Sequence, residues 1–552
     1  MISAIFTKKN MEILRLLEKQ SMHIRQIAER LDISPSKVMD CISLFKEHDL
    51  IREVKDKNKI IIKLNRRSPL LRKIESLFDE GGDSSGEETI NLFENISPFD
   101  FRYYGRNEKI KDKLSPYLSE LGFIRYLANV EAALAKALAK RKICSNQIAL
   151  EIEKACKQVT AKEIYQEEDR IKHNIRALAN SIRKRVSDKA KPYVHFTTTS
   201  HDIICSGDAA RLKDFTNNVL LPTLIEFERT LIGLALREKS TLQIGRTHGQ
   251  HAEPITFGFA IAQYVSRIGT RIVRIKKTGN NLRGKIAGAV GAYNASALFI
   301  KDPEQFEKDV LGYLGIKPSP ISTQVVEAEY VTDYAHAIVS ALGVLANLAD
   351  DMRHLQRSEI GEVAEQFGKK QVGSSTMPHK RNPINFENVK SMWKVIMPRM
   401  DTVYMDQICE HQRDLTNSAS SRFIPEILTG LYVSLTRMNR VMKNLVVDKK
   451  NLKKNFDMNS SMISAEPAYI LLAAHNHPDA HEVVRELTLK SQVEGKKFVE
   501  LFFKDKGLLP YIKKFSTAQI AILKNSENYT GISTKKVEKI CSFWSKEFPQ
   551  KI

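Results

Sequence analysis

The residues best placed to do chemistry lie in one short stretch, residues 373–383, which read GSSTMPHKRNP. Two serines, a lysine and an asparagine fall within it, and its glycine and two prolines prevent a continuous helix. An ordinary surface loop rarely collects so many hydrogen-bond donors beside a cation. Such a loop could supply an activated hydroxyl as a base and a positive charge that binds an anionic group.

Two further polar blocks lie upstream, each between stretches with helical apolar spacing. Residues 245–258 read GRTHGQHAEPITFG, and residues 193–202 read YVHFTTTSHD. In a helical bundle such interruptions either cap helices or build a site. In this order, the three blocks closely resemble the signature blocks of the fumarase/aspartase superfamily, whose lyases eliminate fumarate from a succinyl group.

Four more blocks resemble one branch of that superfamily, the adenylosuccinate lyase family. FRYYG at 101–105 resembles the Arg-Tyr pair that holds the nucleotide phosphate, and ISTQ at 321–324 resembles a substrate-binding block. RDLTNSASSR at 413–422 resembles the family's Arg-Asp…Ser…Arg pattern, and NYTGIS at 528–533 resembles its C-terminal motif. The resemblance runs from about residue 98 to the end.

The resemblance implies a fold class, a reaction and an assembly. The fold would be mainly α, a bundle of long helices in a three-part catalytic region. As a carbon–nitrogen lyase, the chain would release fumarate from adenylosuccinate, giving AMP, and from the succinyl-carboxamide imidazole ribotide of purine synthesis. The assembly would be a homotetramer whose sites combine blocks from three chains. No metal or organic cofactor is expected, since no metal-ligand cluster or phosphate-cradling glycine loop is visible.

The resemblance also implies three catalytic residues. Ser374, the first serine of the pair, would be the base, with Ser375 as the alternative. A serine is a poor base at its free pKa, so backbone N–H groups and Lys380 would have to stabilise its alkoxide. His248 would be the acid, because an imidazole near its normal pKa can protonate a leaving nitrogen at neutral pH. Glu387 would orient that histidine.

A larger set would bind the substrate, an anionic ribotide with one phosphate and two carboxylates. Its cations would neutralise these groups through charge-assisted and bidentate contacts. The implied residues are Arg102, Tyr103, Lys172, His173, Asn174, Thr199, Ser200, Gln324, Lys380, Asn382, Arg413, Ser418 and Arg422. Thr199 and Ser200 would bind one carboxylate, and Lys380 and Asn382 would hold the succinyl carboxylates.

The sequence departs from the family pattern at a few of these positions. Lys172 and Asn174 stand where the family usually has Arg and Asp, on either side of His173. His201 stands where the family often has Thr or Asn, and Gln412 where Glu is usual. None of these is the proposed acid or base, so the departures bear on substrate affinity rather than on reaction type.

Composition sets the outer limits. The chain has 552 residues, more than one ordinary domain, and its 42% hydrophobic and 27% charged content excludes disordered and collagen-like classes. The net charge, 86 − 65 = +21, favours anionic partners: nucleic acid, anionic membrane or small polyanionic substrates. Solvated lysines on helix faces, such as the run at 443–454, account for part of the excess.

Compartment signals are consistent with the cytoplasm. The six cysteines are scattered, with no C-x-x-C pair, as in proteins of a reducing cytosol. The N-terminal residues lack the apolar region and cleavage site of a signal peptide. No stretch of about 18 uncharged apolar residues is present, so no membrane-spanning segment or membrane partner is expected.

Composition shifts divide the chain. The predicted parts are a winged helix-turn-helix-like domain at 1–78, a Gly/Ser/acid-rich linker at 79–97, a lyase N-terminal domain at 98–200, a central long-helix bundle at 201–450 with a signature loop at 371–388, and a C-terminal helical domain at 451–552. In the bundle, segments such as 220–237, 259–277 and 331–357 have apolar residues at i, i+3 and i+4.

The first domain leaves two interpretations open. Three short helices followed by two β-prone runs, 51–54 and 60–64, give the order of a winged helix. Lys37 and Lys46 on its third helix are offset by acids, whereas the hairpin is basic. Nucleic-acid binding is therefore one interpretation, and a docking or oligomerisation module is the other.

Three alternatives to the main function remain at this stage. Another lyase of the superfamily, or a carboxymuconate cycloisomerase, would have a nearly identical signature loop. A ligand-sensing, DNA-binding regulator could keep the lyase fold without its activity. The blocks at 101–105 and 413–422 favour a ribotide substrate, and Ser374, His248, Lys380 and Glu387 together favour retained catalysis.

Overall fold

A computed structural model describes residues 7–56, 59–66, 68–71, 95–368, 370–413 and 415–549. The chain divides into two compact units, Met1–Glu94 and Asn95–Ile552. Of the predicted linker at 79–97, only residues 95–97 lie among those described.

The first unit contains three helices followed by an antiparallel hairpin. Its elements are α1 (Lys8–Lys19), α2 (Ile24–Arg30), α3 (Pro35–Glu47), β1 (Ile51–Asp56) and β2 (Lys59–Leu64). The Ser34 hydroxyl accepts the Lys37 N–H at 3.4 Å and Pro35 opens the first turn, which is why α3 begins there. The element order is that of a winged helix, and the identity of this domain stays a prediction.

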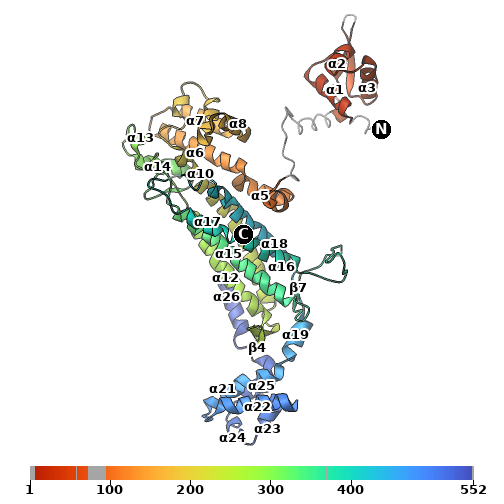
Figure 1. Cartoon of the computed structure of the whole chain (residues 1–552), viewed down its shortest axis with the longest axis vertical. Coiled ribbons are helices and arrows are strands. Elements are labelled where there is room, and N and C mark those ends of the chain that lie inside the picture. Colours follow the sequence, from red (N-terminus) through yellow and green to blue (C-terminus); the bar gives the residue numbers. More distant parts are fainter. Residues whose placement is uncertain are drawn as a thin grey trace. The chain divides into compact units, whose positions relative to one another are not determined.

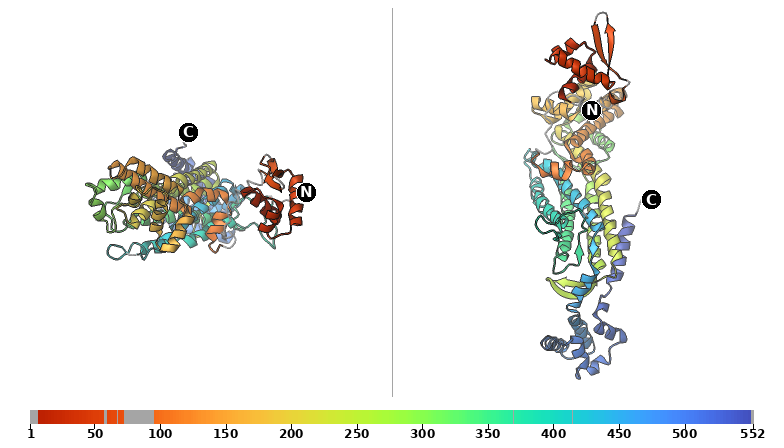
Figure 2. Two further views of the ribbon diagram at one scale, coloured as in Figure 1. Left: turned by 90° about the horizontal axis from the view of Figure 1, so that it is seen from above. Right: turned by 90° about the vertical axis from the view of Figure 1, so that its right-hand side faces the viewer.

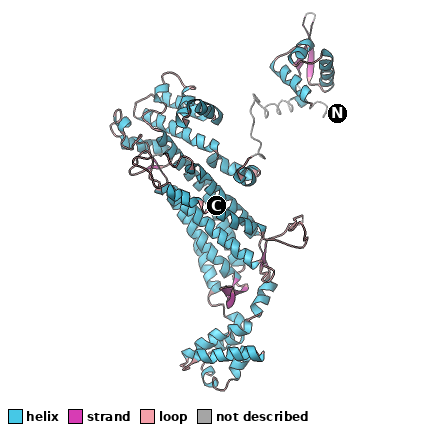
Figure 3. Ribbon diagram, in the orientation of Figure 1, coloured by secondary structure: helices cyan, strands magenta, loops and turns pink. Residues whose placement is uncertain are grey.

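The second unit is mainly helical, as predicted (Figure 3). Its first part contains η3 (Phe99–Gly105), α5 (Glu108–Leu118), α6 (Glu120–Lys140), α7 (Asn146–Gln158), α8 (Ala161–Ile171), α9 (Asn174–Arg183) and η4 (Lys191–Tyr193). Its central part contains α10 (Ser200–Phe215), η5 (Thr216–Leu220), α11 (Leu221–Arg237), β3 (Leu242–Thr247), β4 (Gln250–Thr256), α12 (Phe257–Asn280), β5 (Arg283–Gly284), α13 (Asn294–Ala297), α14 (Pro303–Tyr313), β6 (Lys317–Pro318), α15 (Glu329–Leu355), β7 (Val363–Ala364), α16 (Ile384–Ile396), α17 (Arg399–Met405), η6 (Ser420–Phe423), α18 (Ile424–Lys443) and β8 (Val446–Val447).

The long helices pack side by side into one bundle. α11, α12, α15, α16 and α18 contact one another along their lengths (Figure 1). The predicted long helices 220–237, 259–277 and 331–357 coincide with α11, α12 and α15 to within about three residues at each end. Their apolar stripes merge into a single core that also includes α6 and α10.

α15 is the central helix of this core. By length and composition it could cross a membrane, but 67% of its most apolar window is buried inside the protein. Its neighbours α12, α16 and α18 cover it, which is the environment of a core helix in a bundle.

The last part contains α19 (Lys449–Asp457), α20 (Ser460–Ile463), α21 (Ala465–Ala474), α22 (Ala480–Glu494), α23 (Phe498–Lys504), α24 (Leu509–Ile512), α25 (Thr517–Lys524), η7 (Ser526–Asn528) and α26 (Ser533–Glu547). α21 to α25 surround a small core of their own. α26 instead returns to the bundle beside α11 and α12. A Cβ on Gly269 of α12 would lie 2.4 Å from the Trp544 ring, so the glycine permits this close packing.

Candidate active site

The signature loop, residues 371–388, closes on itself. The Asn382 side-chain amide donates to the Gly373 carbonyl at 3.0 Å, joining the two sides of the loop. A Cβ on Gly373 would lie 2.0 Å from the Lys380 carbonyl oxygen, so only glycine fits there. Lys380 itself is exposed and forms no ion pair with the described residues.

The Ser374 hydroxyl is held by the backbone of this loop. Its Oγ accepts the N–H groups of Met377 at 3.0 Å and Thr376 at 3.3 Å. Two N–H dipoles directed at one oxygen stabilise negative charge on it. The arrangement therefore favours an alkoxide on Ser374, and no such pair of donors is found for Ser375 in the described part of the loop.

A buried carboxylate fixes the end of the loop. Glu365, 5% exposed, accepts the backbone N–H groups of Asn385 and Phe386 at 2.9 and 3.0 Å and the Asn385 side chain at 2.5 Å. These are the second and third N–H groups of α16, which would otherwise be unpaired. Glu387 lies in the first turn of the same helix and is exposed.

His248 lies at the tip of the β3–β4 hairpin. His248 and Gly249 have φ values of 54° and 77°, the left-handed pair that a tight two-residue turn requires. The exposed imidazole thus projects from a short, rigid support. Sequence reasoning placed this block between helices but missed its strands, whose residues are mostly polar.

A buried carboxylate anchors that hairpin to the bundle. Glu362, fully buried, accepts from Gln243 at 2.8 Å, from Arg246 at 2.6 Å and from Asn455 on α19 at 2.9 Å. The hairpin, β7 and α19 are thereby tied together. Glu362 was missed by sequence reasoning because nothing in its local pattern marks a buried acid.

The Thr-Ser block caps α10. Thr199 is the N-cap and Ser200 the first helical residue, and Asp202 completes a capping box. Asp202 also forms a fully buried ion pair with Lys285 at 2.5 Å. This pair, which sequence reasoning missed, locks the start of α10 to the segment after α12.

Strained backbone precedes the cap. His195 and Thr197 have φ values of 62° and 63°, a region that non-glycine residues rarely adopt. The buried Glu131 carboxylate accepts from the His195 backbone N–H at 2.9 Å and contacts its Nδ1 at 2.7 Å. Burial alone would lower the pKa of His195, but the Glu131 charge and hydrogen bond raise it.

The blocks that contain Gln324 and Arg413 lie near each other and near the start of α10. The Gln324 N–H donates to the Gln412 carbonyl at 3.2 Å, and Arg413 Nη1 donates to the Asp406 carbonyl at 3.0 Å. Burial and then the charges of Lys285 and Arg413 lower the pKa of His201 on α10. Thr199, Ser200, Gln324 and Arg413 therefore lie in one neighbourhood.

Arg102 and Tyr103, the pair predicted to bind the phosphate, lie in two different environments. The Tyr103 hydroxyl accepts from Asn388 on α16 at 3.4 Å, so the block at 101–105 lies beside the end of the signature loop. Arg102 is exposed.

The remaining predicted residues lie on the surface of this chain. Ser418 and Arg422 are exposed, and Arg422 is close enough to Tyr165 to affect its pKa. Lys172 and His173 are exposed, and His173 and Asn174 lie at the start of α9. No hydrogen bond joins any of these to the signature loop in the described residues.

The site residues therefore form separate groups in one chain. α10, η5 and α11 form an unbroken helical run from Ser200 to Arg237. At 1.5 Å per residue this run is about 57 Å long, and it separates the Thr-Ser block from the hairpin. Figures 1 and 2 show α10 and the hairpin at opposite ends of the bundle.

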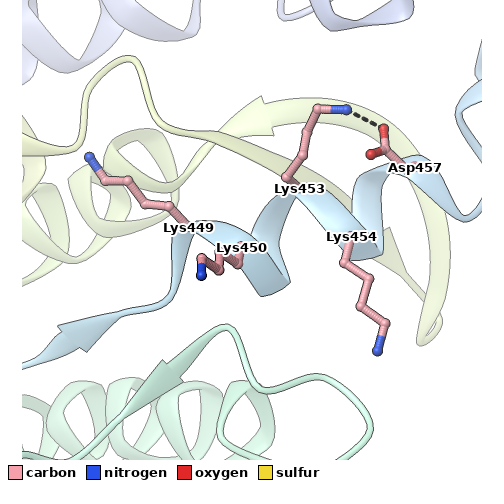
Figure 4. A pocket seen from close by; sticks show the side chains of 5 residues that line it. All are labelled: Lys449, Lys450, Lys453, Lys454 and Asp457. Carbon is pink, nitrogen blue, oxygen red and sulfur yellow. Dashed lines mark hydrogen bonds and ion pairs between the residues drawn. The ribbon is translucent and has the colours of Figure 1, made fainter.

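The C-terminal lysine run borders a surface hollow of about 650 Å³ on α19 (Figure 4). Lys453 pairs with Asp457 and with Glu527, and Lys449 pairs with Glu238 at 3.7 Å. Of the four lysines that line the hollow, Lys449 and Lys453 thus pair with acids, as expected for a solvated helix face.

Comparison with known proteins decides the family. A lyase family model matches residues 87–397, and an adenylosuccinate lyase C-terminal model matches residues 409–520. Adenylosuccinate lyases from Archaeoglobus fulgidus and Pyrococcus abyssi are 31% and 33% identical over 450 and 454 residues, which is 81% of this chain and 98% of each relative. The chain belongs to the adenylosuccinate lyase family. The family predicted from the motifs is confirmed, and so is its class as a lyase.

Solved structures agree with this fold. A 3-carboxy-cis,cis-muconate lactonizing enzyme from Pseudomonas putida has a TM-score of 0.69 at 22% identity, covering 80% of this chain and 98% of that one. A fumarate lyase from Mesorhizobium sp. BNC1 has a TM-score of 0.68 at 20% identity, covering 78% and 97%. At such identities the likeness shows the fold, and the sequence relatives assign this chain to the adenylosuccinate lyase branch.

Proposed function

We propose that this chain cleaves adenylosuccinate to AMP and fumarate, and likewise releases fumarate from the succinyl-carboxamide imidazole ribotide. Membership of the adenylosuccinate lyase family supports the reaction. The single observation that carries the assignment of the base is the Ser374 hydroxyl with two backbone N–H donors.

The chemistry is an elimination. Ser374, as the alkoxide, takes the proton from the carbon beside a succinyl carboxylate. The electron pair of that C–H bond forms the double bond of fumarate while the carbon–nitrogen bond breaks. His248 gives a proton to the departing nitrogen, and Glu387 orients the imidazole. Each proton transfer contributes roughly 10²- to 10⁴-fold.

Electrostatic stabilisation of the transition state supplies the remaining rate enhancement. Negative charge grows on the carboxylate next to the carbanionic carbon, so fixed cations and donors there lower the barrier. Lys380 and Asn382 hold the succinyl carboxylates, and Thr199 and Ser200 bind one of them. The remaining binding roles belong to Arg102, Tyr103, Lys172, His173, Asn174, Gln324, Arg413, Ser418 and Arg422. The substrate is thus an anionic ribotide, and these roles need no metal or organic cofactor.

A homotetramer whose active sites combine residues from several chains brings the Thr-Ser block of one chain close to the hairpin of another. The helical run of about 57 Å between the Thr-Ser block and the hairpin is far beyond the reach of side chains. The bundle also exposes apolar side chains that association would cover, including Val395, Met405, Ile408, Leu415 and Phe423. The protein is then a cytoplasmic enzyme of purine synthesis.

Nucleic-acid binding by the first unit stays a prediction. On α3, the exposed Lys37 stands near the exposed Asp40, and Lys46 pairs with Glu53 at 2.9 Å. Phosphate contacts need clustered free cations, and the acids near these two lysines reduce the net positive charge of this surface.

Fumarate release from adenylosuccinate by the purified protein tests the reaction. Ser374→Ala and His248→Ala should each abolish turnover, while Ser375→Ala, the matched control, should retain it. Mixing the two inactive variants under subunit exchange should restore about one quarter of the activity, because each site then draws its serine and histidine from different chains. Failure of the folded wild type on both ribotides, with turnover of a carboxymuconate, would contradict the proposal.

A further inference from the structure

A buried carboxylate at the start of α10 joins two distant segments of the chain. Asp202 Oδ2 accepts the Thr199 backbone N–H at 2.9 Å, which closes the helix cap. Asp202 Oδ1 accepts from Lys285 Nζ at 2.5 Å, and the Gly288 N–H donates to both oxygens at 3.1 and 3.2 Å. One carboxylate thus connects the Thr-Ser block to a segment that begins 83 residues further along the chain.

Lys285 strengthens this connection from the other side. Its Nζ also donates to the Gly288 carbonyl at 2.8 Å. Its backbone N–H donates to the Ser206 hydroxyl of α10 at 3.1 Å, and that hydroxyl donates to the Lys285 carbonyl at 2.9 Å. Asp202, Ser206 and Lys285 have no exposed surface. Replacing a buried ion pair with apolar residues is often neutral or stabilising, so stability alone does not account for this pair.

The turn from Gly288 to Gly291 lies directly against the block at 321–324. The Gly291 N–H donates to the Gly288 carbonyl at 3.4 Å, and both glycines have a φ of 80°. A Cβ on Gly291 would lie 1.8 Å from the Ser322 carbonyl oxygen. The backbone of the turn and the backbone of the block are therefore in contact, and a side chain between them would force them apart.

The short strands β5 and β6 form a second connection between the same segments. The Ser319 N–H donates to the Gly284 carbonyl at 3.0 Å, and the Ser319 hydroxyl donates to the Ile321 carbonyl at 2.8 Å. The position of Gln324 therefore depends on residues 284–288, which the ion pair holds against α10.

We propose that Asp202 and Lys285 are positioning residues, which set the spacing between the Thr-Ser block and the Gln324 block so that both reach one substrate. This inference rests on the proposed function, in which Thr199 and Ser200 bind a carboxylate and Gln324 contacts the same molecule. Asp202 and Lys285 act through these residues, because their own side chains are fully buried. A binding group misplaced by about 1 Å can cost roughly a hundredfold in rate.

Three variants of the full-length protein test this role. Asp202→Asn keeps the shape of the side chain, but each carboxylate oxygen accepts a backbone N–H, so the new NH2 group must face one of them. Asp202→Asn combined with Lys285→Met removes both charges and leaves no unpaired ammonium group in the core. Gly291→Ala leaves the pair intact and displaces the Ser322 carbonyl instead.

Asp309→Asn and Gly312→Ala are the matched controls. Asp309 also joins two segments, since it pairs with Lys140 at 3.0 Å and Arg141 at 2.5 Å, but these residues lie outside the substrate-binding blocks. A Cβ on Gly312 would meet no atom within 4 Å. Both controls should bind ligands as the wild type does.

The two products, fumarate and AMP, separate positioning from general stability. Calorimetry on the wild type and the Asp202 variants should show fumarate binding weakened about tenfold or more. The loss for AMP should be smaller, because Asp202 contacts Thr199 directly and reaches Gln324 only through the turn. Gly291→Ala should raise the KM for adenylosuccinate about tenfold.

Hydrogen exchange measures the connection between the two blocks without a ligand. In the double variant, amide exchange should accelerate in the peptides that cover residues 196–204 and 320–326, and it should be unchanged in α21 to α25. Acceleration throughout the bundle would contradict the inference, because the pair would then only stabilise the fold.

The inference is overturned if fumarate binds the folded Asp202 variants as it binds the wild type, or if fumarate and AMP lose affinity equally. If the double variant does not fold, Gly291→Ala decides: a raised KM supports the inference, and an unchanged KM overturns it. The proposed function fails differently, when the wild type neither cleaves adenylosuccinate nor binds fumarate. Hydrogen exchange would then still show whether the ion pair couples the two blocks.

Discussion

Replacing Glu228 with methionine should stabilise the catalytic unit. Glu228 lies on α11 with no exposed surface, and both of its carboxylate oxygens lack a partner among the described residues. Burial raises the pKa of this carboxyl to about 9. The group is therefore protonated at neutral pH, and a methionine of similar length would fill the same space without a polar group.

The magnitude follows from proton linkage. Between pH 4.5, the ordinary value, and about 9, the folded protein holds the Glu228 proton and the unfolded chain does not. Stability therefore falls as pH rises, by about 1.4 kcal/mol per unit, or about 3 kcal/mol between pH 4.5 and 7. With about 2.1 cal/mol/K per residue over Asn95–Ile552, that is about 3 °C in Tm.

Thermal unfolding between pH 6 and 8.5 measures this effect. Glu228→Met should melt about 3 °C above the wild type at pH 7, and the difference should widen as pH rises. Glu226→Met on the same helix is the control, because the exposed Glu226 pairs with Lys443 at 2.6 Å and should give no gain. The reasoning would be refuted if Glu228→Met did not raise the Tm, or if the difference in Tm from the wild type did not change with pH.

Three further predictions concern the site and the first unit. Gly373→Ala should lower fumarate release at least tenfold at unchanged Tm, since its Cβ meets the Lys380 carbonyl, whereas Gly368→Ala, whose nearest contact would be 3.8 Å, should not. Glu131→Gln should lower the pKa of His195, measured by NMR of its imidazole, because the carboxylate charge is lost; an unchanged pKa contradicts this role. Deleting residues 1–94, a separate compact unit, should leave fumarate release intact, and a loss of activity on deletion would place that unit in the enzyme's function.

The long helices were predictable because each buries one broad stripe in a shared core. The spacing of apolar residues in α11, α12 and α15 predicts which face of each helix packs against a neighbour. The buried residues of these helices lie on those faces. The Ser34-Pro35 start of α3 was also readable, because the cap is local. Elements whose causes lie within a few residues are those that sequence reasoning recovers.

The supports of the site were not predictable because their causes are distant in sequence. The hairpin at 242–256 is polar and depends on Glu362, more than a hundred residues away. Lys285 is fully buried, although lysines are normally exposed, because its ammonium group forms an ion pair with Asp202. Each buried charge needs a partner from another segment, and that partner is known only once the chain has folded.

The departures at 172, 174 and 412 leave the proposed reaction unaffected for reasons visible in the structure. Gln412 contacts Gln324 through its backbone carbonyl, so the side chain that differs from the family pattern is not what joins the two blocks. His173 caps α9, its Nδ1 accepting the Arg176 N–H at 3.2 Å. That bond leaves the ring proton of the neutral imidazole on Nε2, where it can be donated to a substrate. The helix cap, rather than the identity of the side chains at 172 and 174, sets the tautomer and direction of His173, so Lys172 and Asn174 leave the hydrogen-bonding role of this histidine unchanged.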